Sequence, residues 1–268
     1  MQQSQKRLLS WCILLILPIL GCFFAIQFSL SFPVNVVLIY LTPALFLTFA
    51  RKQWWQSLQH AVFALLVPLP FAIIVDYIGI SSKLWYTVNT GFPWRIFGVI
   101  PLEDLFWMAA GVYTICTLGA YLQKEETHNL FTKKLLSFAV IAVFALAAFF
   151  VFAQWRSEIF VWQSKYTYLV LGSTFALLPA MILLFNFRRA FAKALPLLVY
   201  FMFLTVMLEN TEAFLGHWTF PGNYLLTPPA FLGSPGVPYE EYFFVGIVEV
   251  LVAVGFYAFF TSKPVRRA

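Results

Sequence analysis

Residues 101–107 read Pro-Leu-Glu-Asp-Leu-Phe-Trp, and residues 238–244 read Pro-Tyr-Glu-Glu-Tyr-Phe-Phe. Both stretches, called the first and second acidic box below, carry a proline, two adjacent acids and two aromatic residues at identical spacing. The offset from Pro101 to Pro238 is close to half of the 268-residue chain. A motif that recurs after half a chain indicates that the whole fold is duplicated.

An upstream acid precedes each acidic box. Asp76 stands nine residues before Trp85, and Glu209 stands nine residues before Trp218, with Glu212 one turn further along. The offset from Asp76 to Glu209 is again close to half the chain. Carboxylates near a bilayer are costly and usually serve chemistry or ion movement, so these acids are candidate functional groups.

The composition is typical of a membrane protein with several helices. Hydrophobic residues make up 62% of the chain and charged residues 10%. Unbroken apolar stretches of about 20 residues recur, as a membrane-spanning helix requires, and they argue against the alternating strands of a β-barrel. We therefore predict an all-α integral membrane protein with about eight transmembrane helices, near residues 8–30, 34–50, 57–76, 101–122, 135–153, 166–187, 194–215 and 238–260.

The eight predicted helices divide into two sets of four, each with one acidic box. We predict a first four-helix repeat over residues 1–122, a polar cytoplasmic connector over 123–134 and a second repeat over 135–268. Because each half has an even number of spans, the two repeats should have parallel topology around an axis along the membrane normal.

The basic residues predict which side of the membrane each loop faces. With the N-terminus inside, only Lys83, Arg95, Arg156 and Lys165 of the 17 basic residues lie outside. This asymmetry follows the positive-inside rule, so we expect cytoplasmic termini and, most simply, a bacterial inner membrane. The net charge of +6 then reflects topology and does not indicate nucleic-acid binding. The apolar run after Lys6 lacks a small-residue cleavage site and is expected to remain as the first helix.

Segments 77–100 and 216–237 are longer than a helix bundle needs. Each joins the third helix of its half to the fourth, and each is rich in glycine, proline and aromatic residues. Long ordered loops are usually functional, so we expect them to cap the acids. The alternative is that their tryptophans and tyrosines form only an interfacial belt.

Seven of the eleven acidic residues lie in these motifs, and Glu249 follows further along the last helix. An acid after a proline at a helix start can be a simple cap. Adjacent helical residues point about 100° apart, however, so Glu103 and Asp104 cannot both cap, and one can face the interior. Carboxyl groups gathered at an apolar boundary cannot all ionise, and one that keeps its proton is a Brønsted acid.

Aromatic residues form 20% of the chain, and many flank the motif acids. Aromatic faces near such an acid could stabilise a carbocation by about 0.5–2 kcal/mol each. We therefore predict protonation of an alkene, with the substrate bound by Trp85, Trp94, Phe106, Trp107, Trp218, Phe243 and Phe244.

The sequence lacks cofactor and metal motifs. It has no dinucleotide glycine fingerprint after a strand and no phosphate loop, and Cys12, Cys22 and Cys116 lack metal-ligand spacing. Paired aspartate-rich boxes, which would chelate magnesium for a diphosphate substrate, are also missing. We expect neither a cofactor nor a metal.

The acidic boxes and their upstream acid-to-tryptophan pairs resemble those of the integral-membrane lycopene cyclases, which occur as heterodimers or fused chains in bacteria, archaea and fungi. The resemblance covers nearly the whole chain, with both halves fused. It implies a redox-neutral, flavin-independent cyclisation of the linear ψ ends of lycopene to β-ionone rings, giving γ-carotene and then β-carotene. The substrate would be lycopene or another linear carotenoid, dissolved in membrane lipid.

The resemblance implies catalytic roles for the motif acids. Glu103 and Glu240 are the first candidates for the catalytic acid, with Asp104 and Glu241 as their partners. The upstream acids rank second: Asp76, Glu209 and Glu212. The first box has Glu-Asp where the family usually has Glu-Glu.

Other functions fit the same residues. A carotenoid hydratase, or a cyclase for C50 carotenoids, shares the first protonation and differs in what captures the cation. A proton-coupled transporter would also carry acids, but usually within broken helices near the midplane, whereas most of these acids lie at helix ends. The sequence leaves a homo-oligomer open.

Overall fold

The computed structural model describes residues 3–123, 129–192, 194–226 and 236–262. Residues 124–128 of the predicted connector, and residues 227–235 of the second long loop, lie outside the described residues. Within the described ranges eight helices are long and apolar enough to cross a membrane: Arg7–Phe28, Phe32–Arg51, Trp54–Ser81, Leu102–Leu122, Lys133–Trp155, Thr167–Asn186, Leu195–Phe214 and Tyr239–Thr261. The predicted helical class and number of spans are thereby confirmed.

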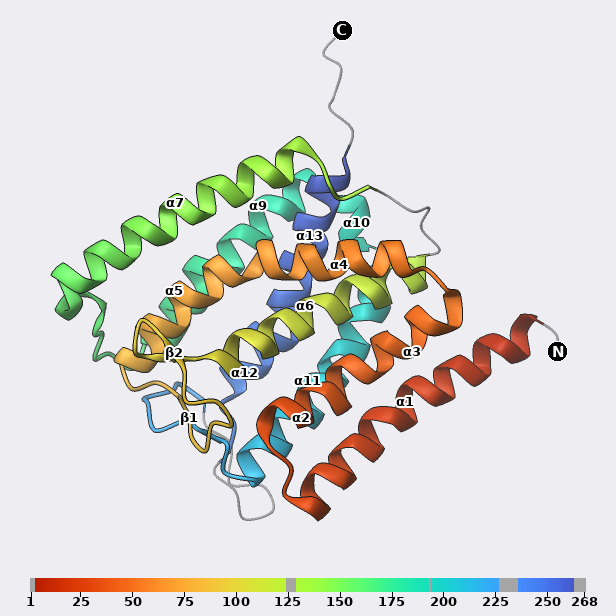
Figure 1. Cartoon of the computed structure of the whole chain (residues 1–268), viewed down its shortest axis with the longest axis horizontal. Helices are drawn as coiled ribbons and strands as arrows, with labels where there is room; N and C mark the ends of the chain where they lie inside the picture. The colour runs from red at the N-terminus through yellow and green to blue at the C-terminus, as the bar shows by residue number, and fades with distance from the viewer. Residues whose placement is uncertain (1–2, 124–128, 193, 227–235, 263–268) are drawn as a thin grey trace, which may run out of the picture.

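Several spans consist of more than one helical element (Figure 1). The α-helices are α1 (Gln3–Phe28), α2 (Phe32–Val36), α3 (Thr42–Arg51), α4 (Trp54–Leu66), α5 (Pro68–Ser81), α6 (Leu102–Gln123), α7 (Lys133–Trp155), α8 (Thr167–Gly172), α9 (Leu178–Asn186), α10 (Arg188–Ala192), α11 (Leu195–Phe214), α12 (Tyr239–Phe243) and α13 (Val250–Thr261). The π-helices are η1 (Val37–Leu41), η3 (Ser173–Leu177) and η4 (Phe244–Glu249), and η2 (Ser157–Phe160) is a 3₁₀ turn. The strands are β1 (Tyr86–Thr87), β2 (Arg95–Ile96), β3 (Ile100–Pro101) and β4 (Trp218–Thr219).

Two of the π-helices occupy matching places in the two halves of the chain. The π-helix η1 lies in the second span just before Pro43, and η3 lies in the sixth span just before Pro179. Proline has no backbone N–H and clashes with the carbonyl four residues earlier, and a wider π turn relieves that clash. The number of residues from Pro43 to Pro179 is larger than the number from Asp76 to Glu209 and smaller than the number from Pro101 to Pro238.

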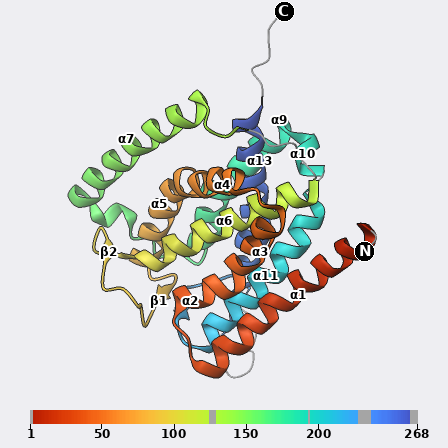
Figure 2. The ribbon, with the colours of Figure 1, turned by 45° about the vertical axis from the view of Figure 1, so that its right-hand side comes forward.

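Helix α6 lies in the middle of the bundle, whereas α1 and α7 run along opposite edges (Figures 1 and 2). It packs on α3, α4, α5, α11 and α13, and it is the most buried of the eight spans, while α7 is the least buried. Large apolar side chains such as Ile141 and Phe144 stand exposed on α7. Since lipid tails are as apolar as leucine, a bilayer can cover this surface.

The two long loops meet over one end of the bundle. Strand β1 of the first loop pairs antiparallel with β4 of the second, with Tyr86 opposite Thr219 and Thr87 opposite Trp218. In the first loop, β2 and β3 form a hairpin whose turn holds Gly98 at a φ of +72°. The described parts of the loops are therefore ordered against each other, at the end of the bundle where α5 ends and α6 and α12 begin.

Candidate functional site

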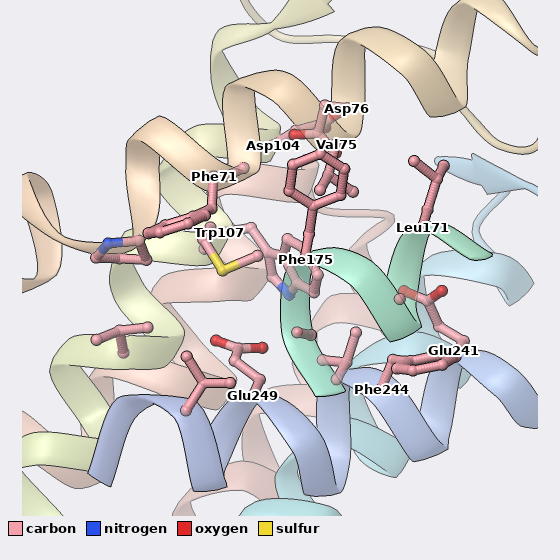
Figure 3. Close-up of a pocket in the computed structure, with 18 of the residues that line it drawn as sticks. Phe71, Val75, Asp76, Asp104, Trp107, Leu171, Phe175, Glu241, Phe244 and Glu249 are labelled. Carbon is pink, nitrogen blue, oxygen red and sulfur yellow. The ribbon is translucent and has the colours of Figure 1, made fainter. Parts of the chain in front are cut away.

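A cavity lies between the two halves of the chain, next to the paired loops. Its walls come mainly from α5 and α6 of the first half and from α8, η3, η4 and α13 of the second, and Trp85 and Trp218 of the loops also line it. Its volume is about 170 Å³. Most of its lining side chains are apolar, and Figure 3 shows the carboxyl groups spaced among them.

Four carboxyl groups line this cavity. Asp76 lies in the last turns of α5, Asp104 in the first turn of α6, Glu241 in α12 and Glu249 at the end of η4. Asp76 interacts electrostatically with both Asp104 and Glu241, and Figure 3 shows Glu241 and Glu249 at other sides of the cavity. The structure thus brings three of the seven predicted acids together and adds Glu249.

The second acid of each box faces the cavity and accepts a hydrogen bond from a hydroxyl group. Thr87 Oγ1 donates to Asp104 Oδ1 at 2.6 Å, and the hydroxyl of Tyr168 donates to Glu241 Oε2. The other oxygen of Asp104, Oδ2, has no hydrogen-bond partner among the described residues. Asp104 is therefore held through one oxygen, and the other makes no hydrogen bond within the described residues that would compete for a proton.

The first acid of each box lies outside the cavity lining and holds the long loop before it. Glu103 Oε1 accepts the backbone N–H of Phe92 at 2.8 Å. Glu240 Oε1 accepts the N–H groups of Leu225 and Leu226 at 2.6 and 3.2 Å. Leu225 follows Phe92 by the same number of residues by which Glu209 follows Asp76, so the two loop contacts occupy matching positions. These contacts fix the loops over the site.

Glu209 and Glu212, in the last turns of α11, also lie outside the cavity lining. Glu209 is fully buried, and neither of its carboxyl oxygens has a hydrogen-bond partner among the described residues. It interacts electrostatically with Glu241 and Glu249. Glu212 Oε2 lies 2.6 Å from Nδ1 of His217, so this acid contacts a loop histidine instead of the cavity.

No described basic side chain forms an ion pair with a cavity acid. The ion pairs within the described residues are Arg156–Glu158 and His217–Glu212. The hydrogen bond from Arg156, on an exposed loop, holds the pKa of Glu158 below its usual range. An ionised carboxylate without a partner is costly in an apolar site, so a cavity of this kind suits carboxylic acids that keep a proton.

The structure divides the seven predicted aromatic residues into two groups. Four line the cavity: Trp85, Trp107, Trp218 and Phe244. Three lie outside its lining and are exposed: Trp94, Phe106 and Phe243. The first group gives the cavity aromatic faces, while the exposed rings are available to the surrounding membrane.

The two loop tryptophans that line the cavity each pack on a helix of the opposite half. Trp85 of the first loop makes an edge contact with Tyr168 at a centroid distance of 5.6 Å, and Trp218 of the second makes one with Phe32 at 5.2 Å. Tyr168 follows Phe32 by the same number of residues by which Pro179 follows Pro43. The two tryptophan contacts therefore lie at matching positions of the two halves. Only Tyr168 has a hydroxyl group, and it is this group that binds Glu241.

Gly79 gives Trp85 its place against α5. A Cβ atom at residue 79 would lie 2.1 Å from the indole ring. We expect Gly79→Ala to displace Trp85 and to lower the free energy of unfolding by about 1–3 kcal/mol through overpacking. Thermal unfolding in detergent measures this loss. Gly119→Ala, whose new Cβ would meet Leu197 at an ordinary 3.5 Å, is the matched control, and equal unfolding temperatures for the two variants would contradict the expectation.

Sequence reasoning did not select two polar residues of the cavity, Tyr168 and Glu249. Glu249 follows Glu241 by eight residues. In an α-helix this spacing would rotate the Glu249 side chain roughly 80° about the helix axis from that of Glu241. The wider turn of η4 reduces this rotation. Its matching residue in the first half is Val112, so the repeat gave no signal for it. Tyr168 reaches Glu241 from a distant helix of the same half, and its counterpart Phe32 is apolar.

Among the described residues, no group of three or more His, Cys, Asp or Glu side chains is placed to hold a metal ion. No protein-family model, no curated protein and no solved structure matches this chain. The resemblance to lycopene cyclases therefore stays a prediction from the acidic boxes.

Proposed function

We propose that this chain is an integral-membrane lycopene cyclase, which isomerises the ψ ends of the carotenoid to β-ionone rings. The observation that carries the proposal is an apolar cavity inside the helical bundle, with four carboxyl groups and no ion-pair partner for them among the described residues. A linear hydrocarbon offers alkenes to protonate and C–H bonds to deprotonate. Positioned acids and bases are the groups that perform such transfers.

The cavity has the size of one end of a carotenoid. Its volume of about 170 Å³ is close to the ~150 Å³ of an apolar cavity that binds benzene. A folded ψ end, which becomes a methylated six-membered ring, needs space of this order. Phe71, Val75 and Phe175 line the cavity and are partly exposed, so the rest of the polyene can extend past them into lipid.

The reaction needs one proton delivered and one removed. A carboxylic acid protonates C2 of the ψ end, which turns the C1–C2 double bond into a cation at C1. The C5–C6 double bond then attacks C1, which forms the C1–C6 bond and moves the charge to C5. Loss of the C6 proton to a carboxylate creates the C5–C6 double bond of the β ring. No atom or electron is gained overall, so the reaction is an isomerisation.

We assign these proton transfers to acids on the cavity wall. Asp76 and Asp104 line the cavity from the first half of the chain, and Glu241 lines it from the second half. Either the side with Asp76 and Asp104 or the side with Glu241 donates the proton to C2, and the opposite side accepts the proton from C6. Glu103 and Glu240 are then positioning residues, which act by holding the loops.

The aromatic lining favours cyclisation over hydration. Trp107 and Trp218 stand edge to face with a centroid distance of 4.9 Å, and Trp85 also lines the cavity. Each aromatic face can stabilise a carbocation by about 0.5–2 kcal/mol. The internal alkene is held beside C1 within the same bound molecule, so it has the advantage over water in capturing the cation.

We also propose that residues 1–122 and 135–268 are parallel repeats related by a twofold axis along the membrane normal. The antiparallel pairing of β1 with β4 supports this, because Tyr86 lies opposite Thr219, its counterpart at the offset of the upstream acids. The matching glutamate-to-loop bonds and the matching π-helices before proline support it as well. Such a repeat accounts for a cavity between the halves.

The test is expression in a lycopene-accumulating bacterium, followed by pigment chromatography. We expect γ-carotene and β-carotene, and membranes assayed in heavy water should incorporate one deuterium, at C2, for each ring formed. Membranes with the double variant Asp104→Asn and Glu241→Gln are the control for ring formation. Unchanged lycopene would overturn the proposal, and a hydroxylated acyclic product would assign a hydratase instead.

Removing the hydroxyl of Tyr168 should slow the reaction while leaving the cavity intact. Hydrogen bonds to a charged group are worth about 1.5–3 kcal/mol, so Tyr168→Phe is expected to reduce the initial rate roughly 10- to 100-fold. Tyr200→Phe is the matched control, because the buried hydroxyl of Tyr200 donates to the backbone carbonyl of Leu14 at 2.7 Å, outside the cavity. Equal rates for both variants would show that the Tyr168 hydroxyl has no part in catalysis.

A further inference from the structure

We infer that each chain has a single catalytic cavity, which takes the two ends of the carotenoid in separate binding events, and that Gly172 and Ala176 set its size. This inference rests on the proposed cyclase activity. A twofold repeat would by itself suggest that the space between the halves extends equally into both of them, with room for one end of the substrate in each. The side chains at matching positions in the two halves argue otherwise.

The residues that leave room in the cavity have large counterparts in the other half. Gly172 and Ala176 follow Val36 and Tyr40 by the same number of residues by which Pro179 follows Pro43. Val36 and Tyr40 are therefore their counterparts in the first half. With the offset that relates the upstream acids, Pro68 of the cavity wall corresponds to Phe201. At each of these three positions, the residue on the counterpart side is larger.

These large side chains fill the counterpart position. Val36, Tyr40 and Phe201 are at most 1% exposed and belong to one hydrophobic core cluster. The rings of Tyr40 and Phe201 lie 5.3 Å apart. Protein cores are packed at the density of organic crystals, so a core of this kind has no space for a substrate ring.

On the cavity side, the small residues are required by close packing. A Cβ atom at Gly172 would lie 2.6 Å from the ring of Phe244, so any side chain there would displace this ring of the cavity wall. Ala176 lines the cavity from the same helical span. A tyrosine at residue 176 would add a ring of about the size that a cavity of ~150 Å³ holds.

One ring-sized cavity cannot hold both ends of a long, rigid polyene at once. The protein must therefore release the monocyclic product, or let it turn around, before the second end of the carotenoid can enter the cavity. Both ends then react with the same acids, and the monocyclic product is a true intermediate that the same site consumes.

The test compares pigments from lycopene-accumulating cells that express the wild type, Ala176→Tyr or Thr174→Tyr. Thr174 is an exposed residue of the same π-helix outside the cavity lining, so Thr174→Tyr adds the same ring facing lipid and should form normal products. We expect Ala176→Tyr to lose both cyclisations by roughly 100-fold or more, because misplaced substrate ends do not react. Immunoblotting of membranes and the elution volume in detergent show whether each variant is folded.

Ala176→Val provides a second measurement, since it fills the cavity only in part. Its γ-carotene should accumulate and later be converted to β-carotene, because one site performs both steps. Persistent γ-carotene as the end product of Ala176→Tyr or Ala176→Val would overturn the single cavity, since it would reveal a second site for the other end. Unchanged lycopene with the wild type would overturn the cyclase proposal and this inference with it.

Discussion

Glu241→Gln and Asp104→Asn are each expected to reduce ring formation by about 10²–10⁴-fold, the range that general acid–base catalysis contributes. Both carboxyl groups line the cavity, and each is held by a hydroxyl donor, Tyr168 or Thr87. The amide that replaces each acid keeps the shape and accepts the same hydrogen bond, but it cannot transfer a proton. The initial rate of β-ring formation in membranes, corrected for the amount of protein, measures the effect.

Glu103→Gln and Glu240→Gln are the matched controls for these variants. Each lies directly before a cavity acid in sequence, yet each holds a loop through backbone N–H groups that an amide oxygen can also accept. Their rates should remain within about tenfold of the wild type, whereas Glu103→Ala should destabilise the protein by about 1–3 kcal/mol, because it leaves a loop N–H unpaired. Inactive Glu103→Gln with active Asp104→Asn would reverse the assignment.

The eight spans could be predicted because each depends on the length and hydropathy of one segment. The meeting of the two long loops was less accessible. Their length and the shared acid-to-tryptophan spacing predicted that they cap the acids, but the pairing of β1 with β4 joins residues about half the chain apart. A pairing at that distance depends on how the whole bundle brings the loops together.

The rotation of α6 and α12 decides which acid of each box reaches the cavity. The sequence showed that Glu103 and Asp104 point in different directions, but only neighbouring elements fix which direction is the interior. The bond from the Phe92 N–H to Glu103 and the bond from Thr87 to Asp104 make that choice. Glu249 could not be found from the repeat either, because its place on the cavity wall depends on the π turn of η4 and its counterpart is a valine.

Glu249→Met should make the protein more stable and less active. Glu249 lines the cavity, and its Oε1 has no hydrogen-bond partner among the described residues. A buried polar group left unsatisfied costs about 1–3 kcal/mol, and methionine fills similar space without that cost. Thermal unfolding in detergent should therefore shift upward, by roughly 2–4 °C for each kcal/mol gained.

The same substitution should lower the rate of ring formation about tenfold or more, because a fixed carboxyl group beside the cavity stabilises the charge that develops on the substrate. Glu249→Gln keeps the polar group and should lose rate without gaining stability. Glu158→Met, on an exposed loop, should change neither quantity much and controls for added hydrophobicity.

A drop in stability for Glu249→Met would mean that the carboxyl group helps to hold the bundle together. A normal rate would mean that the acids nearer the loops perform the reaction alone. An increase in stability with a loss of rate is the pattern expected of a group retained for function at the expense of stability.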